Sequence, residues 1–182
     1  APGGKTAQLA YAGAHVTAVD LSRNRLRRLS ANLDRLGLEA ELVEADALKY
    51  EAEKPFDAVL LDAPCSSTGT VRRHPDVPWT KSEADIETLA ALQGRLLSKA
   101  AALVRPGGVL VFSNCSLDPR EGEHLVAPFL ADCPAARLDR VRPDEIPGTA
   151  EFVTPEGLLR TTPAGLRMAS PELSGLDGFF AA

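Results

Sequence analysis

One apolar stretch of the chain ends abruptly in polar and reactive residues. Residues 58–61 read Ala-Val-Leu-Leu, and Asp62, Pro64 and Cys65 follow directly. Such a run is typical of a strand that is buried on both faces of a sheet. A carboxylate and a thiol are costly to bury for packing alone, and ligands of open α/β sheets bind where strands end. Asp62 and Cys65 are therefore site candidates, although a turn aspartate beside a small buried cysteine fits the same residues.

A second strand-like run ends in the same way. Residues 109–112 are apolar, follow a Pro-Gly-Gly stop, and lead into Asn114 and Cys115. Adjacent strands of a sheet lie about 4.8 Å apart. If the two runs are neighbouring strands, Asp62, Cys65 and Cys115 line one small cleft.

The first twenty residues have the pattern of a nucleotide-binding unit. Gly3 and Gly4 lead into a helical stretch, and a strand beginning at His15 ends at Asp20. Glycines at a helix start let the backbone approach a ligand, and an acid about 20 residues later is placed to accept from ribose hydroxyls. The letters Gly-Gly-Lys-Thr also equal the end of a P-loop, a reading that makes no special use of Asp20. A plain capped helix start is a third interpretation.

An amphipathic helix is predicted from Ser22 to Leu36, because leucines recur on one face. These leucines are Leu26, Leu29, Leu33 and Leu36. The arginines of this helix most simply form a solvated face, but Arg25 is close enough to Asp20 to reach a ligand there. A short strand at 41–44 is followed by Asp46, which is placed either to read an adenine amino group or to stabilise a turn.

The loop at 66–80 is longer than most loops without a function. It carries Arg72, Arg73, His74 and Trp79, which can hold phosphates and stack on a base. An exposed loop with one anchoring tryptophan fits the composition equally well.

The rest of the chain is predicted to contain two helices and several closing strands. Ser82 and Asp85 begin a helix that stops before the Pro-Gly-Gly sequence, and a second helix is predicted from Asp118 to Leu130. Short antiparallel strands are expected at 150–153, 158–162 and 179–181.

Composition narrows the class of protein. A chain of 182 residues is long enough for one domain with a core, and no apolar run approaches the length of a membrane span. Three cysteines without regular spacing argue against a disulfide framework and favour a reducing compartment. A bacterial-type cytoplasm or a nucleus fits this, and a cytoplasmic location is expected. Cys133 is interpreted as structural. A net charge of −5 means that any surface for a polynucleotide must be local or lie on another domain.

Three motifs taken together resemble the bacterial Sun and eukaryotic nucleolar Nop2 (RsmB-like) family of RNA cytosine-5 methyltransferases. The motifs are Ala1–Thr6, Asp62–Gly69 and Asn114–Ser116. The loop at 72–76 and the closing 177–180 agree as well, and the loop is most similar to the branch that acts on small-subunit ribosomal RNA. The sequence departs from the family at Asn114, where threonine is usual, and at Ser67, where glycine is common.

The resemblance implies a Rossmann-like class I S-adenosylmethionine-dependent methyltransferase, with a mostly parallel sheet and an antiparallel closing strand. It implies that residues 1–182 are one catalytic domain, incomplete at both ends, without its first core strand or an upstream RNA-binding domain. Cys115 is the implied nucleophile on C6 of a cytosine, Asp62 the group that binds N3, and Cys65 the group that helps release product. Neither a metal nor a membrane is implied. The implied cofactor-binding residues are Ala1, Pro2, Gly3, Gly4, Lys5, Asp20, Arg25, Asp46 and Asp62.

Three other interpretations of the sequence stay open. DNA cytosine-5 methyltransferases use a Pro-Cys nucleophile, which in this sequence is Cys65. A P-loop NTPase would use Asp62 as a magnesium-binding acid. A catalytically silent RNA-binding or assembly factor would keep the fold without the reaction.

Overall fold

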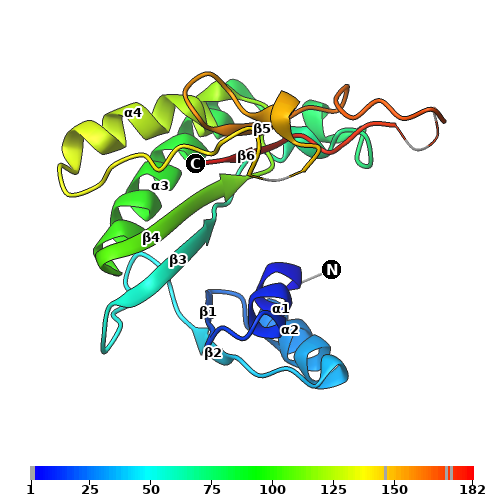
Figure 1. Cartoon of the computed structure of the whole chain (residues 1–182). Coiled ribbons are helices and arrows are strands. Elements are labelled where there is room, and N and C mark those ends of the chain that lie inside the picture. Colours follow the sequence, from blue (N-terminus) through cyan, green and yellow to red (C-terminus); the bar gives the residue numbers. More distant parts are fainter. Residues whose placement is uncertain (1–2, 146, 171, 173) are drawn as a thin grey trace. The chain divides into compact units, whose positions relative to one another are not determined.

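The computed structural model describes residues 3–145, 147–170, 172 and 174–182 (Figure 1). Two of the expected cofactor-binding residues, Ala1 and Pro2, lie outside the described residues. The chain divides into two compact units, residues 1–52 and 53–182, and each is described by itself.

The first unit contains two parallel strands and two helices. Its elements are α1 (Gly4–Tyr11), β1 (Thr17–Asp20), α2 (Arg23–Leu36) and β2 (Glu41–Glu44). β1 and β2 are in register from Thr17 opposite Glu41 to Asp20 opposite Glu44. Both strands therefore end at the same edge, and the predicted strand–helix–strand order is confirmed.

Helix α2 forms where the leucine pattern predicts it. Ser22 caps its first turn by accepting from the Arg25 N–H, and Gly37 ends the helix at a φ of 65°, a conformation that glycine adopts without strain. Leu26, Leu29 and Leu33 are buried, but Leu36 is 48% exposed. The prediction that Leu36 belongs to the packed face is wrong, because it is the last helical residue and lies beyond the packed turns.

The second unit contains a four-stranded sheet in the order β3-β4-β6-β5. Its strands are β3 (Phe56–Asp62), β4 (Val104–Asn114), β5 (Leu159–Thr161) and β6 (Phe179–Ala181). β3 and β4 are parallel, whereas β6 runs antiparallel to both β4 and β5. The predicted pairing of the two strands that lead into the cysteines is confirmed. The strand predicted at 150–153 is wrong, because Ala150–Phe152 forms a 3-10 helix and Val153 makes only an isolated bridge to Leu159.

Helices α3 (Glu83–Ala102) and α4 (Glu123–Asp132) lie on the same side of β3 and β4 (Figure 1). The predicted capping box of α3 is present, with Ser82 and Asp85 bonding each other's backbone N–H. The predicted helix at 118–130 begins later than expected, because Pro119–Glu121 form a 3-10 turn first. The core beneath the helices consists of Ala63, Leu97, Phe112, Val126, Leu158 and Phe180.

The opposite face of β3 and β4 is only partly covered. Leu60 and Val111 are each 37% exposed, whereas their neighbours Leu61 and Phe112 pack with the core. The prediction that β3 is buried on both faces is therefore wrong for this unit, because the helices cover one face and successive side chains alternate between faces. Within the described residues, no helix combines the length and the apolar character that a membrane span requires.

Candidate active site around two cysteines

The ends of β3 and β4 bring two cysteines into contact. Asp62, the last residue of β3, lies opposite Ser113 of β4. Cys65 follows three residues after Asp62, and Cys115 follows directly after β4, so that their sulfur atoms lie 3.5 Å apart. Both cysteines are half-buried and neither is in a disulfide. The predicted convergence of the two thiols is confirmed.

The backbone around Cys115 is held by hydrogen bonds with two other segments. The Gly69 N–H donates to the Cys115 carbonyl over 2.8 Å, and the Leu117 N–H donates to Thr68 Oγ1 over 2.9 Å. From β5, Arg160 donates to the Ser116 carbonyl over 2.5 Å. The loop that carries the nucleophile candidate is thus tied to the Cys65 loop and to the closing strands.

Arg160 itself is fixed from two further directions. Its guanidinium donates to both carboxylate oxygens of Glu123, over 2.9 and 2.6 Å, and lies 4.8 Å from the centre of the Phe180 ring. A bidentate pair of this kind fixes direction as well as distance. Arg160 therefore presents a rigid donor to the Cys115 loop.

The two thiols are electrostatically unequal. The hydrogen bond between the sulfur atoms, together with burial, raises the pKa of Cys65. For Cys115, the hydrogen bonds with Cys65 and then with Ser67 outweigh burial and the nearby charge of Asp62, and they lower its pKa to about 6. Cys115 is then mostly a thiolate at neutral pH, and the thiolate is the nucleophilic form of cysteine.

Ser67 is a site residue that the sequence reasoning noted only as a departure from the family. Its hydroxyl lies 3.6 Å from the Cys115 sulfur and 3.9 Å from the Cys65 sulfur. Its φ is 59°, a left-handed conformation that is unfavourable for a residue with a side chain. This backbone conformation places the hydroxyl beside both sulfur atoms.

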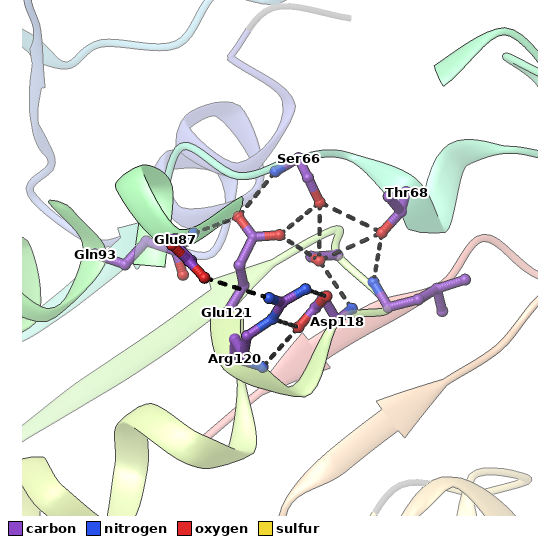
Figure 2. A network of polar contacts seen from close by, with 9 residues as sticks. Ser66, Thr68, Glu87, Gln93, Asp118, Arg120 and Glu121 are labelled. Carbon is purple, nitrogen blue, oxygen red and sulfur yellow. Dashed lines mark hydrogen bonds and ion pairs between the residues drawn. The ribbon is translucent and has the colours of Figure 1, made fainter. Parts of the chain in front are cut away.

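Glu121 and Gln93 form a second, buried group of polar residues that the sequence reasoning missed (Figure 2). Both are 0% exposed, and the Gln93 amide donates to Glu121 Oε1 over 2.9 Å. In the sequence, Glu121 lies in an acidic Pro-Arg-Glu-Gly-Glu run that reads as a helix start. Nothing in that pattern distinguishes a buried glutamate from the exposed ones.

The arginine-rich loop is tied to the closing segment. Arg73 donates to the Asp177 carboxylate over 2.7 Å, and Arg72 lies 3.9 Å from the same carboxylate. Trp79 is 89% exposed, so the interpretation of an anchoring tryptophan is wrong. The loop instead presents an exposed aromatic face together with partly neutralised arginines.

In the first unit, the glycine loop enters α1 without a side-chain cap. Gly3 has a φ of 80°, and a Cβ at this position would lie 2.2 Å from Leu29 Cδ1, so only glycine fits here. A Cβ on Gly4 would meet nothing within 4 Å. The first turn, which includes Lys5, has no side-chain cap, and its N–H groups suit the carboxylate of a ligand.

Asp20 and Asp46 follow the two parallel strands of the first unit. Asp20 accepts from the Ser22 N–H over 2.7 Å and from the Arg25 guanidinium over 2.8 to 3.0 Å. These contacts orient the carboxylate and raise the pKa of Arg25, mainly through the hydrogen bond. Asp46 accepts from the Leu48 N–H over 3.0 Å, as a turn aspartate does. The carboxylate acceptors at this edge fit an adenosyl group, since carboxylates accept from ribose hydroxyls.

Across the described part of the chain, no three His, Cys, Asp or Glu side chains form a group that could hold a metal ion. The expectation that the reaction uses no metal stays a prediction.

Comparison with known proteins decides the family. The family model for 16S rRNA methyltransferase RsmB/F matches residues 1–182. The chain belongs to the RsmB/F family. It is 42% identical over 161 residues to ribosomal RNA small subunit methyltransferase B of Serratia proteamaculans, covering 86% of this chain and 38% of that protein. The same-named protein of Pseudomonas putida is 42% identical over 186 residues, covering 99% of this chain and 39% of that protein.

A solved structure of similar sequence supports the fold assignment. The crystal structure of NSun6 from Pyrococcus horikoshii with SFG has a TM-score of 0.80 and 31% sequence identity, covering all of this chain and 44% of that one. The predicted fold class, a Rossmann-like α/β methyltransferase domain, is confirmed. The chain spans less than half the length of these relatives.

Proposed function

We propose that this chain is the catalytic part of an S-adenosylmethionine-dependent enzyme that methylates C5 of a cytosine in small-subunit ribosomal RNA. The observation that carries the proposal is the thiol pair: Cys65 and Cys115 in contact, with their pKa values moved in opposite directions. One thiol is thereby suited to attack and the other to act as an acid or base. The names of the Serratia and Pseudomonas relatives support the RNA substrate.

The chemistry gives each side chain a role. C5 of cytosine is a weak nucleophile because the ring is aromatic. The Cys115 thiolate adds to C6, and the electron pair that it displaces makes C5 nucleophilic. Asp62, acting as an acid, donates a hydrogen bond to N3 and stabilises the negative charge that develops there during the addition. After C5 is methylated, its proton passes to water and the C–H electron pair re-forms the C5–C6 double bond. The Cys115 sulfur then leaves C6 as a thiolate, and Cys65 assists this release.

The residues of the first unit are proposed to hold the methyl donor. S-adenosylmethionine supplies an electrophilic methyl group on a sulfonium. The Ala1 to Lys5 loop is proposed to hold its methionine part, and the uncapped start of α1 at Gly4 supports this. Asp20, oriented by Arg25, is proposed to accept from the ribose hydroxyls, and Asp46 to read the adenine. Asp62 is included in this set as well as in the catalytic set.

The RNA is proposed to enter as an unpaired segment. A base within a duplex cannot reach a half-buried thiol, so the target cytosine has to leave its stack. The loop with Arg72, Arg73 and the exposed Trp79 offers cations and an aromatic face next to the closing segment. Stacking of a neighbouring base on Trp79 is worth about 1–3 kcal/mol.

The test uses ribosomal RNA that contains 5-azacytosine, which traps a covalent adduct at C6. We expect the wild-type protein and Cys65→Ala to be trapped, and Cys115→Ala to give no adduct. If Cys65→Ala abolishes trapping and Cys115→Ala does not, the thiol roles are reversed. If the wild-type protein transfers no labelled methyl group to RNA, the enzymatic proposal fails, and RNA binding alone would then favour a silent assembly factor.

A further inference from the structure

Glu121 is a fully buried carboxylate that the proposed reaction does not use. Its four hydrogen-bond donors are all neutral (Figure 2). Oε1 accepts from the Ser66 N–H over 2.9 Å and from Gln93 Nε2 over 2.9 Å. Oε2 accepts from the Ser66 hydroxyl over 2.5 Å and from the Ser116 hydroxyl over 2.6 Å. The adjacent Arg120 turns instead toward Asp118.

Packing alone does not explain a carboxylate in this position. Burying a charge is expensive unless the surrounding groups satisfy it, and an apolar residue of similar size often gives equal stability. A carboxylate has only acceptor sites, so the four donors, which come from Ser66, Gln93 and Ser116, match it well. What Glu121 provides, and a leucine cannot, is a common attachment point for those residues.

The attached segments are the two that carry the thiols. Ser66 follows Cys65 directly, and Ser116 follows Cys115 directly. The two serine hydroxyls also lie 3.1 Å from each other. The carboxylate thus joins the residue after one cysteine to the residue after the other.

The remaining bonds of the group reinforce the same connection. Gln93 of α3 also donates to the Pro64 carbonyl over 2.9 Å, which fixes the Cys65 loop a second time. Asn114 donates to the Glu121 backbone carbonyl over 2.5 Å and accepts from the Ser116 N–H over 2.9 Å. The direct partners of Glu121 therefore hold the Cys65 loop before and after its thiol, and the Cys115 loop likewise.

We propose that Glu121 is a positioning residue, whose buried carboxylate holds Ser66 and Ser116 and so keeps the sulfur atoms of Cys65 and Cys115 in contact. The proposal builds on the proposed function, because it assigns a purpose to that contact. Glu121 is 0% exposed and so does not touch the substrate; it acts only through the loops. Loosening the loops lengthens the sulfur–sulfur contact, which is the largest cause of the lowered pKa of Cys115.

Among the described residues, the charged and titratable groups that act on Cys115 come from two segments. They are Cys65 and Asp62 from the β3 side and Arg73 from the long loop, with Ser67 as the neutral hydroxyl. The Glu121 carboxylate bonds to Ser66, Gln93 and Ser116 and not to the sulfur atom. Loss of its negative charge would by itself favour the thiolate and lower the midpoint, so a raised midpoint after a Glu121 substitution reports a change of geometry.

The experiment measures the alkylation rate of Cys115 by iodoacetamide against pH, in wild type, Glu121→Ala and Glu121→Gln. Trypsin separates the three cysteines into different peptides, so mass spectrometry follows Cys115 alone. We expect a wild-type midpoint near pH 6. In Glu121→Ala we expect the midpoint to rise by about one pH unit or more. A rise of one unit lowers the thiolate fraction at pH 5 about tenfold, but a thiolate of higher pKa is intrinsically more nucleophilic. The alkylation rate at pH 5 therefore falls several-fold.

Glu121→Gln is the milder variant, and it keeps the proposal testable if Glu121→Ala does not fold. Its NH2 group cannot face the N–H donors at Oε1, so it faces the two serine hydroxyls. The two short bonds there then lengthen to about 2.9 Å, typical of N–H···O. We expect a midpoint shift of about half a unit. Glu87→Gln is the matched control, because its side chain is 70% exposed, and its midpoint stays at the wild-type value.

The proposal is overturned if Glu121→Gln keeps the wild-type midpoint, whatever its stability. That result would assign Glu121 to stability alone. In methyl transfer, we expect Glu121→Gln to lower kcat while KM for RNA stays within about twofold, because the carboxylate does not contact RNA. The alkylation profile needs neither cofactor nor RNA, so it stands or falls separately from the proposed reaction.

Discussion

Replacing Gly69 by alanine tests how tightly the site is closed. A Cβ at Gly69 would lie 2.2 Å from the Gly178 carbonyl oxygen and 2.7 Å from the Cys115 carbonyl oxygen. Both neighbours are backbone atoms, which cannot rotate away as a side chain would. The segments must therefore separate.

The cost of that separation follows from the hydrogen bonds that weaken and from the crowding that remains. The Gly69 N–H bond to Cys115 (2.8 Å) and the Gly178 N–H bond to Gly69 (2.7 Å) both lengthen. Each is worth about 0.5–1.5 kcal/mol. Overpacking adds about 1–3 kcal/mol. We expect Gly69→Ala to lower the free energy of unfolding of the second unit by about 4 kcal/mol, and to abolish the low midpoint of Cys115 alkylation.

The assay is urea unfolding followed by circular dichroism, with the slope checked for two-state behaviour. Gly94→Ala is the control. Gly94 lies inside α3, and its Cβ would meet only Leu125 Cδ2 at 4.0 Å. Alanine is the better helix former, so we expect this variant to gain about 0.5–1 kcal/mol. A loss below about 1 kcal/mol in Gly69→Ala would refute the reasoning.

Three further predictions concern the thiol pair and its supports. Cys115 alkylation falls as the pH drops through about 6, because protonation removes the thiolate; a midpoint near 8.5 would contradict the lowered pKa. Cys65→Ala raises that midpoint, since the largest stabilising hydrogen bond is removed, and an unchanged midpoint would exclude this cause. Ser67→Gly raises the free energy of unfolding by about 1 kcal/mol in urea titrations, because the strain of the φ of 59° at Ser67 is relieved; a less stable variant would contradict the strain. The same variant raises the midpoint of Cys115 alkylation, because the hydrogen bond with the Ser67 hydroxyl is lost.

Much of this architecture is predictable because periodicity and strand ends are local signals. The leucines of α2 and the capping box of α3 each lie within a few residues of the element that they define. The thiol pair was also predictable, since neighbouring parallel strands place their following residues at the same edge. The exposed face of β3 was not, because an apolar run does not reveal which face a helix covers.

The buried carboxylate was beyond sequence reasoning for a different reason. Glu121 is satisfied by residues 66, 93 and 116, of which two lie far away in the chain. Sequence reasoning could not identify Ser67 as a site residue either. Its position depends on a left-handed backbone conformation and on two sulfur atoms that the fold brings close to its hydroxyl. The local sequence pattern predicts the position of a polar residue along a helix or strand. It does not predict which hydrogen-bond donors from distant parts of the chain surround that residue.

The close contact of Gly69 with Gly178 has a consequence for how the molecule is made. The two glycines are about 110 residues apart, and a ribosome adds about 5–20 residues per second. For roughly 5–20 s after Gly69 leaves the ribosomal tunnel, the segment that it contacts has not yet followed. Late in that interval the nascent chain already contains Cys65 and Cys115, but it lacks β6 and the Gly178 N–H that bonds to Gly69. The two thiols therefore reach their final arrangement only after residue 178 has emerged.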